Sequence, residues 1–508
     1  MASVRADKIR VGVATFTDPR ETAGTREREK YNNSCHRRLK RFLRESGFQP
    51  IDAMNELRPN WSAAKGNFGL GRTDEVFRAA DFLNANRIDC LVIGAWHWTD
   101  SFLPVRLQIH TDVPVALVCM DDPTWGGTVF VTAVSASMKE TAANSHALTN
   151  RRFKEDWDGL AKWVRGVGAL QQMRRASALL WGGTYSLRME HLQDDIPALK
   201  SFLIGDILQE GQMFLAHKAE QILSSQPKRI DKMLDWLRSH KTTITYDDKM
   251  ATTEAVRRQI ALYLGARDRL DELKEEEPVQ GVSIKCQHEL SELWGTTACS
   301  LPALLPFTSD AERKRRDLLP TVCEGDIKGL LTGMLLNKIQ PDVPPLFGDV
   351  RYIGPDFWII SNCGASSIYF AANSLDPEEA LPKVTIQAQC QGASGAAFGY
   401  FGKPCVLTLA RLTRAAGEYS MQLGLGRVVQ FDRATLQTLG FGSMWPLHKI
   451  TMTSDMKLFF DVVGANHFSA TVGDVSESVE AACFEAGIRL VRVDDNDSLL
   501  QERSLIVE

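Results

Sequence analysis

The sequence predicts an α/β protein in which two Rossmann-like α/β domains with parallel sheets are followed by a β-rich C-terminal domain. Short, almost wholly apolar strand patterns alternate with helical patterns over most of the chain. After about residue 350, alternating patterns of hairpin length replace them. At 508 residues the chain is also too long for a single hydrophobic core. We therefore expect domains at residues 1–170, 171–345 and 346–508.

The first domain opens on a buried strand at residues 9–16, followed by a turn and a long polar helix that ends near Arg44. Further apolar strands are expected at 90–94 and 113–118. Between them and the first strand, residues 75–86 carry apolar side chains at helical spacing. No GxGxxG motif follows the first strand, which argues against a Rossmann dinucleotide site there.

The second domain is expected to begin with a strand at 176–181, and helical patterns dominate from 196 to 273. Another strand is expected at 282–286. Gln287 follows at its carboxyl end, which is the end where open α/β sheets bind ligands. The basic run at 313–316 is most simply a solvated helix face.

A helix with an unusual face is predicted after Glu324. Gly325, Gly329 and Gly333 recur every four residues, although glycine costs about 1 kcal/mol in a helix interior relative to alanine. We expect another backbone to pack closely along that side. Asp326 is expected to cap this helix, whereas capping explains Glu324 less well.

The third domain is expected to be an antiparallel sheet or barrel, because turn signals separate short strand patterns. The expected strands lie at 357–360, 383–388, 405–410 and 427–431. A last helix near 479–486 and a strand at 489–493 are expected to close the chain.

Composition narrows the class of protein. A net charge of -4 and scattered Lys/Arg residues give no reason to expect nucleic acid or an anionic membrane as a partner. No apolar run approaches the ~18–20 residues that span a bilayer, and the first residues lack the apolar core of a signal peptide. Ten cysteines without a CxxC pair argue against zinc ribbons and a disulfide framework. The simplest expectation is a cytoplasmic enzyme.

Two carboxylates and a histidine on short glycine-containing turns form a plausible divalent metal site: Glu324, Asp349 and His467. Three such donors leave coordination positions open for substrate oxygens, and oxygen-rich ligation suits Mn²⁺ or Mg²⁺ better than a thiophilic metal. A lone histidine on a loop is more often structural, and His97 and His448 are the alternative imidazoles. Cys323, beside Glu324 on a strand, should face the opposite way and be buried.

Several segments, in the same order along the chain, resemble motifs of the L-fucose isomerase family. They are Asp18-Pro19-Arg20, Gly24-Thr25-Arg26-Glu27, Glu324-Gly325-Asp326, Phe347-Gly348-Asp349-Val350-Arg351, Ser361-Asn362-Cys363-Gly364-Ala365-Ser366 and Gly464-Ala465-Asn466-His467. The resemblance spans most of the chain. It implies two α/β domains, a β-rich third domain, and an active site between the second and third domains that is completed across a subunit contact.

The resemblance also implies roles for individual residues. Metal ligands fall on Glu324, Asp349 and His467, and the first two are also the acid/base carboxylates. Substrate contacts fall on a further set: Arg20, Gln287, Trp445, Asn466 and, from a neighbouring subunit, Trp96. A family tyrosine is lost near Ala393. The implied cofactor is Mn²⁺, or another divalent cation such as Mg²⁺ or Co²⁺, and the implied assembly is a homo-oligomer, a hexamer by resemblance.

The chemistry expected is interconversion of a free aldose and its ketose through an enediol, with a 6-deoxyhexose or pentose (L-fucose- or D-arabinose-like) as substrate. Such a reaction moves a proton between adjacent carbons, and carboxylates can both take and return it. Two alternatives stay open. One is another metal-dependent sugar reaction such as epimerisation, and the other is a non-catalytic sugar-binding protein on the same fold.

Overall fold

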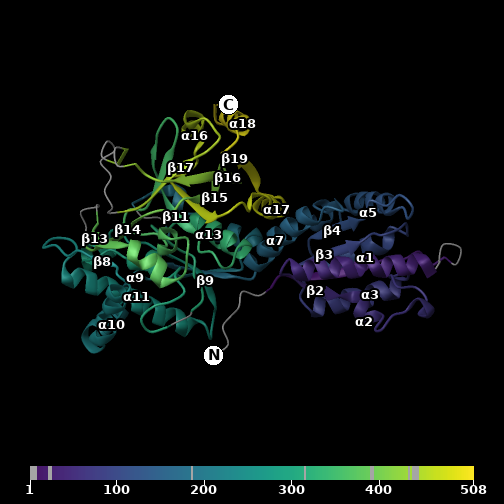
Figure 1. Ribbon diagram of the computed structural model, residues 1–508, viewed down its shortest axis with the longest axis horizontal. Helices are drawn as coiled ribbons and strands as arrows, with labels where there is room; N and C mark the ends of the chain where they lie inside the picture. The colour runs from purple at the N-terminus through teal and green to yellow at the C-terminus, as the bar shows by residue number, and fades with distance from the viewer. Residues whose placement is uncertain are drawn as a thin grey trace. The chain divides into compact units, whose positions relative to one another are not determined.

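The computed structural model (Figure 1) describes residues 8–20, 26–184, 187–313, 316–389, 394–432, 435–436 and 445–507. Contacts divide the chain into two compact units. The N-terminal unit comprises Arg5–Gln172 and Glu477–Gly487, and the main unit comprises Met173–Ser476 and Ile488–Glu508. We describe each by itself. Among the described residues, no helix is long and apolar enough to cross a membrane.

The N-terminal unit contains the predicted parallel sheet. All neighbouring strands are parallel, and their order is β2-β1-β3-β4-β5. The strands are β1 (Arg10–Thr15), β2 (Gln49–Asp52), β3 (Cys90–Gly94), β4 (Val115–Cys119) and β5 (Arg151–Lys154). This is the flavodoxin-like order. The strand at 151–154 is one that the sequence analysis did not predict, because only Phe153 of its four residues is buried.

Helices cover both faces of this sheet, as near-continuous apolar strands require. One face packs against α2 (Ala53–Leu57), α3 (Thr73–Ala85), α4 (Phe102–Thr111) and α5 (Gly127–Thr141). The other packs against α1 (Arg26–Glu45) and α7 (Trp157–Met173). Neighbouring strand residues alternate between the two cores: Ile93 lies in the first and Val92 in the second. Helix α6 (Ser145–Leu148) and α17 (Ser476–Ala486) complete the unit.

The main unit opens with a second parallel sheet, in the order β10-β9-β6-β7. The strands are β6 (Ser177–Trp181), β7 (Asp206–Glu210), β9 (Val279–Ile284) and β10 (Thr321–Cys323). Helices dominate 196–273 as expected, but strand β7 within that range was not predicted. That strand lies at the sheet edge and is only half apolar, so it carries the exposure pattern of a surface helix.

The other sheet of the main unit confirms the β-rich C-terminal prediction and closes into a barrel. The pairings among the described strands run β16-β15-β18-β11-β12-β17 and return to β16, all antiparallel. These strands are β11 (Leu346–Ile353), β12 (Trp358–Ser361), β15 (Cys405–Ala415), β16 (Glu418–Val429), β17 (Pro446–Thr451) and β18 (His467–Val472). Closure leaves no free edge within the ring. Whether residues 171–345 and 346–508 are separate domains stays a prediction.

Further strands extend the barrel on two sides. They are β19 (Arg489–Arg492) beside β16, then β14 (Ala396–Phe401), β13 (Thr385–Ala388) and β8 (Thr243–Ile244) beyond β17. The helices of the unit are α8 (Ile196–Phe202), α9 (Gln212–Ser225), α10 (Pro227–Ser239), α11 (Thr253–Leu273), α12 (Ser300–Leu304), α13 (Ile327–Ile339), α14 (Pro377–Ala380), α16 (Met456–Val462) and α18 (Asn496–Val507). Helix α18 follows the strand that was predicted to end the chain.

Helix α13 corrects the prediction made from the glycine spacing. Gly325 precedes the helix, in a turn with φ of 68°. A Cβ on Gly329 would lie 2.6 Å from Cε2 of Phe347, and one on Gly333 would lie 3.3 Å from Cγ of Pro345. The close neighbours are therefore side chains rather than a second backbone. The glycines let Phe347 and Pro345, around the start of β11, lie directly on the helix.

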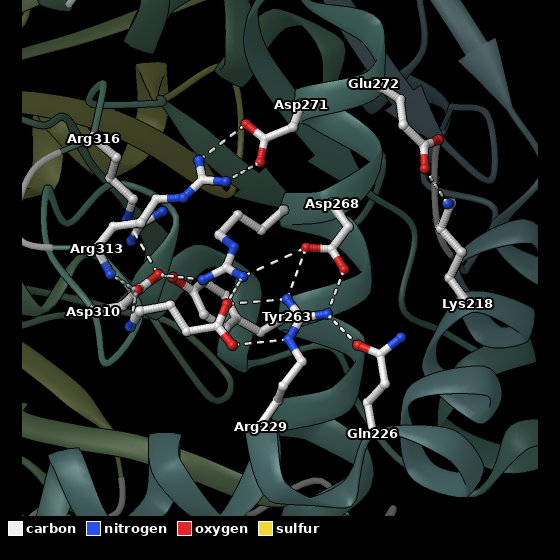
Figure 2. A network of polar contacts seen from close by, with 12 residues as sticks. Lys218, Gln226, Arg229, Tyr263, Asp268, Asp271, Glu272, Asp310, Arg313 and Arg316 are labelled. Carbon is white, nitrogen blue, oxygen red and sulfur yellow. Dashed lines mark hydrogen bonds and ion pairs between the residues drawn. The ribbon is translucent and has the colours of Figure 1, made fainter. Parts of the chain in front are cut away.

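A network of charged side chains holds the segment before β10 against α11 (Figure 2). Arg229 binds Asp268 and Glu312, at 2.7 and 2.8 Å. Asp310, which is buried, accepts from the Tyr263 hydroxyl at 2.6 Å and from Arg267 at 2.9 Å. Arg313 and Arg316 belong to the same network: Arg313 binds Asp271 at 3.1 Å, and Arg316 lies 3.7 Å from Asp310. The prediction of a solvated helix face at 313–316 was therefore wrong for Arg313 and Arg316, while residues 314 and 315 lie outside the described residues.

Replacing Tyr263 with phenylalanine tests this network. Burial opposes ionisation of Asp310, but the hydrogen bond from Tyr263 and the charge of Arg267 hold the pKa of Asp310 below its usual value. A hydrogen bond to a charged group contributes about 1.5–3 kcal/mol. Tyr263→Phe should therefore lower the free energy of unfolding by about 2 kcal/mol, measured by urea denaturation. Tyr246→Phe, which removes a surface hydroxyl bonded to Arg238, is the matched control; equal losses in both variants would contradict the prediction.

Candidate metal centre

The barrel brings two of the predicted ligands face to face. Asp349 on β11 and His467 at the start of β18 are directly paired across the antiparallel ladder. Cβ atoms of such partners lie about 4.5–5.5 Å apart, so the register alone makes these side chains neighbours. The imidazole of His467 is fully buried, and the carboxylate of Asp349 is 26% exposed.

Glu324 reaches the same place from the parallel sheet. It follows β10 directly and has a left-handed backbone, with φ of 64°. That conformation costs about 1–2 kcal/mol for a residue with a Cβ, and such strain gathers at functional sites. Together with Gly325 it turns the chain sharply from β10 into α13. The turn directs Glu324, only 8% exposed, toward His467.

The donor atoms of Glu324, Asp349 and His467 all lie within 4.8 Å of one another. Nε2 of His467 is 3.3 Å from Oε2 of Glu324 and 3.2 Å from Oδ1 of Asp349. Within the described chain no other group of three such donors is this close. The structure therefore brings together the three residues that the sequence predicted as ligands.

Asp326 fixes which nitrogen of His467 faces this cluster. Its Oδ2 lies 2.8 Å from Nδ1 of His467. A carboxylate can only accept, so in the neutral imidazole that a metal requires, Nδ1 carries the proton and Nε2 presents a lone pair to Glu324 and Asp349. Nε2 is buried and makes no well-formed hydrogen bond to any described residue. A histidine that binds a metal typically donates one ring N–H to a carboxylate and directs its other nitrogen at the ion. Here Asp326 is the carboxylate at Nδ1, and Nε2 faces Glu324 and Asp349.

Charge in the cluster also favours a divalent cation. Three carboxylates (Glu324, Asp326 and Asp349) and one guanidinium, from Arg411, surround the imidazole, which leaves a net charge of -2 when His467 is neutral. Burial alone would lower the pKa of His467, but the charge of Asp349, the hydrogen bond to Asp326 and the nearby Glu324 carboxylate raise it well above its ordinary value. The cluster thus attracts a cation at Nε2, and the triad fits a divalent metal ion.

The dual role of Asp326 was only half predicted. It caps α13 as expected, since Oδ1 accepts from the Gly329 amide at 2.8 Å. Its other oxygen binds both His467 and Arg411, and Arg411 is fully buried on β15. Burial opposes ionisation of Asp326, yet Arg411 and His467 hold the pKa of this carboxyl far below its usual range. An arginine within the apolar pattern of β15 was the available signal for a buried anionic partner.

Phe347 supports the imidazole from one side. Its ring centroid lies 4.7 Å from that of His467, with the planes tilted by 54°. The ring occupies the space that Gly329 leaves open on α13. The glycine-bearing helix therefore contributes to the site by letting an aromatic side chain pack against the buried ligand.

Asn466 is the predicted substrate contact that the structure places at the centre. Its Nδ2 donates to Oδ1 of Asp349 at 3.0 Å. Gln287 follows β9, which runs parallel to β10, so it and Glu324 leave the same edge of the sheet. Trp445 immediately precedes β17 and is 8% exposed, with the guanidinium of Arg351 4.4 Å from its ring centroid. Contacts of these three residues with a sugar stay predictions.

Arg20 and Trp96 belong to the N-terminal unit. Arg20 is exposed and forms an ion pair with Asp18, Nε to Oδ1 being 2.8 Å. Trp96 is 1% exposed, and its indole nitrogen donates to Thr15 Oγ1 at 3.0 Å. The ring is packed inside the core of this unit, and a contact of Trp96 with a sugar stays a prediction. Trp98, two residues later and 41% exposed, is the aromatic of this stretch with an open surface.

The alternative imidazoles are not part of the cluster. His448 is buried within the main unit, and burial lowers its pKa to about 3. His97 is a buried residue of the N-terminal unit, with Nδ1 2.5 Å from the Trp98 carbonyl oxygen. The position of the lost tyrosine, Ala393, and residues Gly24 and Thr25 lie outside the described residues.

Cys323 is buried, as expected, and one of four thiols around a cavity of about 10 Å³. The others are Cys286, Cys299 and Cys363. The cavity has the size of a single water, but its lining is mostly apolar, and a water needs two to four polar partners. Among the described residues these four thiols are not a donor group that could hold a metal ion.

Comparison with known families identifies the barrel region. Residues 360–493 match the family model of the L-fucose isomerase C-terminal domain. This part of the chain is similar to the C-terminal domain of L-fucose isomerases. This domain carries His467, Asn466 and Trp445, whereas Glu324 and Asp349 precede the matched residues. The match confirms the predicted resemblance and supports a sugar isomerase family. No curated protein matches the chain.

Proposed function

We propose that this protein is a metal-dependent aldose–ketose isomerase that acts on a free 6-deoxyhexose or pentose, L-fucose- or D-arabinose-like. The observation that carries the proposal is the cluster of Glu324, Asp349 and His467, with donor atoms within 4.8 Å of one another. The L-fucose isomerase C-terminal domain that supplies His467 supports it. Hard carboxylate oxygens and one imidazole favour Mn²⁺, with Mg²⁺ or Co²⁺ as alternatives.

The residues present can perform the proton transfer. Isomerisation takes a proton from one sugar carbon and returns one to its neighbour. Glu324 and Asp349 supply a carboxylate base and, once protonated, a carboxylic acid. Glu324 is nearly buried, and its backbone is held by the turn into α13, so its position is set before substrate arrives. A bound divalent cation would stabilise the negative charge that develops on the sugar oxygens.

The remaining residues supply binding in this proposal. Gln287, Trp445 and Asn466 contact the sugar, and Arg20 is kept as a further proposed substrate contact. A homo-oligomer, a hexamer by resemblance, completes the site, and the protein acts in the cytoplasm. A pure sugar-binding protein would have no use for a strained, buried glutamate within reach of two other metal donors. That observation favours catalysis over the binding-protein alternative.

Metal removal tests the proposal directly. Protein treated with a chelator and then dialysed should convert no aldose in a panel that includes L-fucose and D-arabinose. Added Mn²⁺ should restore formation of the ketose, followed by NMR of the products. Detection of a C2 epimer in place of a ketose would support the epimerase alternative. Turnover that survives complete metal removal would contradict the proposal.

A further inference from the structure

An imidazole that the sequence analysis did not single out lies behind the metal centre. His191 sits on the short helix η2 (Glu190–Leu192) in the main unit. Its Nε2 lies 2.6 Å from Oδ1 of Asn466. Asn466 in turn donates from Nδ2 to Oδ1 of Asp349 at 3.0 Å. A continuous chain of two hydrogen bonds therefore joins His191 to a candidate metal ligand.

The direction of these hydrogen bonds follows from the chemistry of the groups. The Asp349 carboxylate only accepts, so the amide nitrogen of Asn466 must face it. The amide oxygen then faces His191, and Nε2 of His191 must carry the proton. If the amide were reversed, its oxygen would meet the Asp349 carboxylate and two acceptors would repel each other. When protonated on Nε2, His191 donates to Asn466 only in the orientation in which Asp349 receives a donor.

The backbone of Asn466 is already fixed, so its side chain is the variable part. The Asn466 carbonyl accepts from the Val350 amide at 2.5 Å, which extends the β11–β18 ladder past the Asp349–His467 pair. Rotation about the side-chain bonds can still swing the amide away from Asp349. A second hydrogen bond to the same amide, from His191, removes that freedom.

The segment that carries His191 is anchored nearby by Asp194, whose side chain is fully buried. Asp194 is 3.2 Å from Nζ of Lys328 on α13 and 2.5 Å from Nη1 of Arg414 on β15. It also accepts from the Tyr419 hydroxyl on β16 at 2.7 Å. Burial opposes ionisation, yet Tyr419, Lys328 and Arg414 lower the pKa of Asp194 below its usual value. The residue Asp194, just after η2, thus ties this segment to α13, which Asp326 caps, and to β15, which carries Arg411.

We propose that His191 is a positioning residue of the metal centre and acts through Asn466 to hold the Asp349 carboxylate in its ligating orientation. The expected effect on catalysis rests on the proposed function. The expected effect on metal affinity does not. Loss of hydrogen-bond partners behind a metal ligand typically weakens metal binding about 10–100-fold. His191 is one residue further out, so we expect the lower end, about tenfold.

The test measures Mn²⁺ binding to the full-length, metal-free protein by calorimetry. His191→Ala should weaken binding about tenfold, and His191→Gln, which keeps an N–H donor, should restore most of the affinity. Glu190→Gln, a neighbouring substitution on the same short helix, is the matched control and should leave the affinity unchanged. Wild-type affinity in His191→Ala would overturn the proposal.

A double-mutant cycle tests whether His191 acts through Asn466. If it does, adding His191→Ala to Asn466→Ala should cause no further loss of Mn²⁺ affinity. Independent, multiplicative losses would overturn the route. In kinetics with the active aldose, adding His191→Ala to Asn466→Ala should likewise cause no further loss of kcat. A wild-type protein that binds Mn²⁺ through these residues but isomerises no aldose would refute the proposed function and leave the positioning role intact.

Discussion

Glu324→Gln is expected to reduce isomerisation by at least about a hundredfold, because a general acid–base carboxylate contributes roughly 10²–10⁴ in rate. The same substitution replaces a charged metal donor with a neutral amide, so the loss should be at the upper end. Steady-state kinetics with the active aldose at saturating Mn²⁺ measures the effect. Asp349→Asn should behave alike, since Asp349 has the same two roles in the proposal. Near-wild-type activity in either variant would contradict these roles.

Stability measurements separate this loss from misfolding. Without metal, Glu324, Asp326 and Asp349 crowd three carboxylates around one imidazole. Glu324→Gln removes part of that repulsion, so the metal-free variant should unfold at the same temperature as wild type or higher. Bound ligand stabilises by about 2.7 kcal/mol at a hundred times its Kd, so the same Mn²⁺ concentration should raise the midpoint of wild type more than that of the variant. Asp342→Asn, on an exposed turn before β11, is the matched control and should keep both activity and metal response.

Much of the fold could be predicted from local pattern, and the exceptions share a physical cause. The strands at 90–94 and 176–181 are apolar on both faces, which marks buried parallel strands directly. Strand β7 was not predicted because an edge strand needs only half of its residues to be apolar. Closure of the barrel depends on β16 pairing with β17, and on β11 pairing with β18 more than a hundred residues later. The local pattern of apolar and polar residues cannot predict pairings between strands that lie so far apart in the sequence.

The candidate site divides in a similar way. Glu324, Asp349 and His467 could be predicted because metal ligands must be of a few chemical types and because the surrounding motifs resemble those of a known family. The expectation that all three stand on turns was wrong: only Glu324 does, while Asp349 and His467 lie on strands β11 and β18. Asp326 was predicted to cap a helix, but capping uses only one carboxylate oxygen. It gives no indication that the other oxygen binds His467 and Arg411. His191 gave no signal at all, since a single histidine beside Leu192 fits any surface helix. Residues that act behind a ligand are selected by contact across the fold, and sequence neighbours do not reveal them.

Arg411→Met is expected to destabilise the protein by about 3–5 kcal/mol, the usual cost of removing one partner from a buried ion pair. Both Arg411 and Asp326 are fully buried, so the carboxylate would be left with only the Gly329 amide and His467 to offset its charge. Urea denaturation followed by fluorescence measures the loss. Arg427→Met, an exposed arginine on the neighbouring strand β16, should change stability by less than about 0.5 kcal/mol.

The double variant Asp326→Asn with Arg411→Met separates stability from metal binding. Removing both charges of a buried pair is often close to neutral, so much of the stability lost in Arg411→Met should return. Mn²⁺ affinity should not return, because the neutral amide that replaces the Asp326 carboxylate no longer raises the basicity of His467 at Nε2. We expect a deficit of about 10–100-fold relative to wild type. Recovery of both properties together would mean that Asp326 serves only the fold, and that His467 needs no carboxylate behind it to bind a metal.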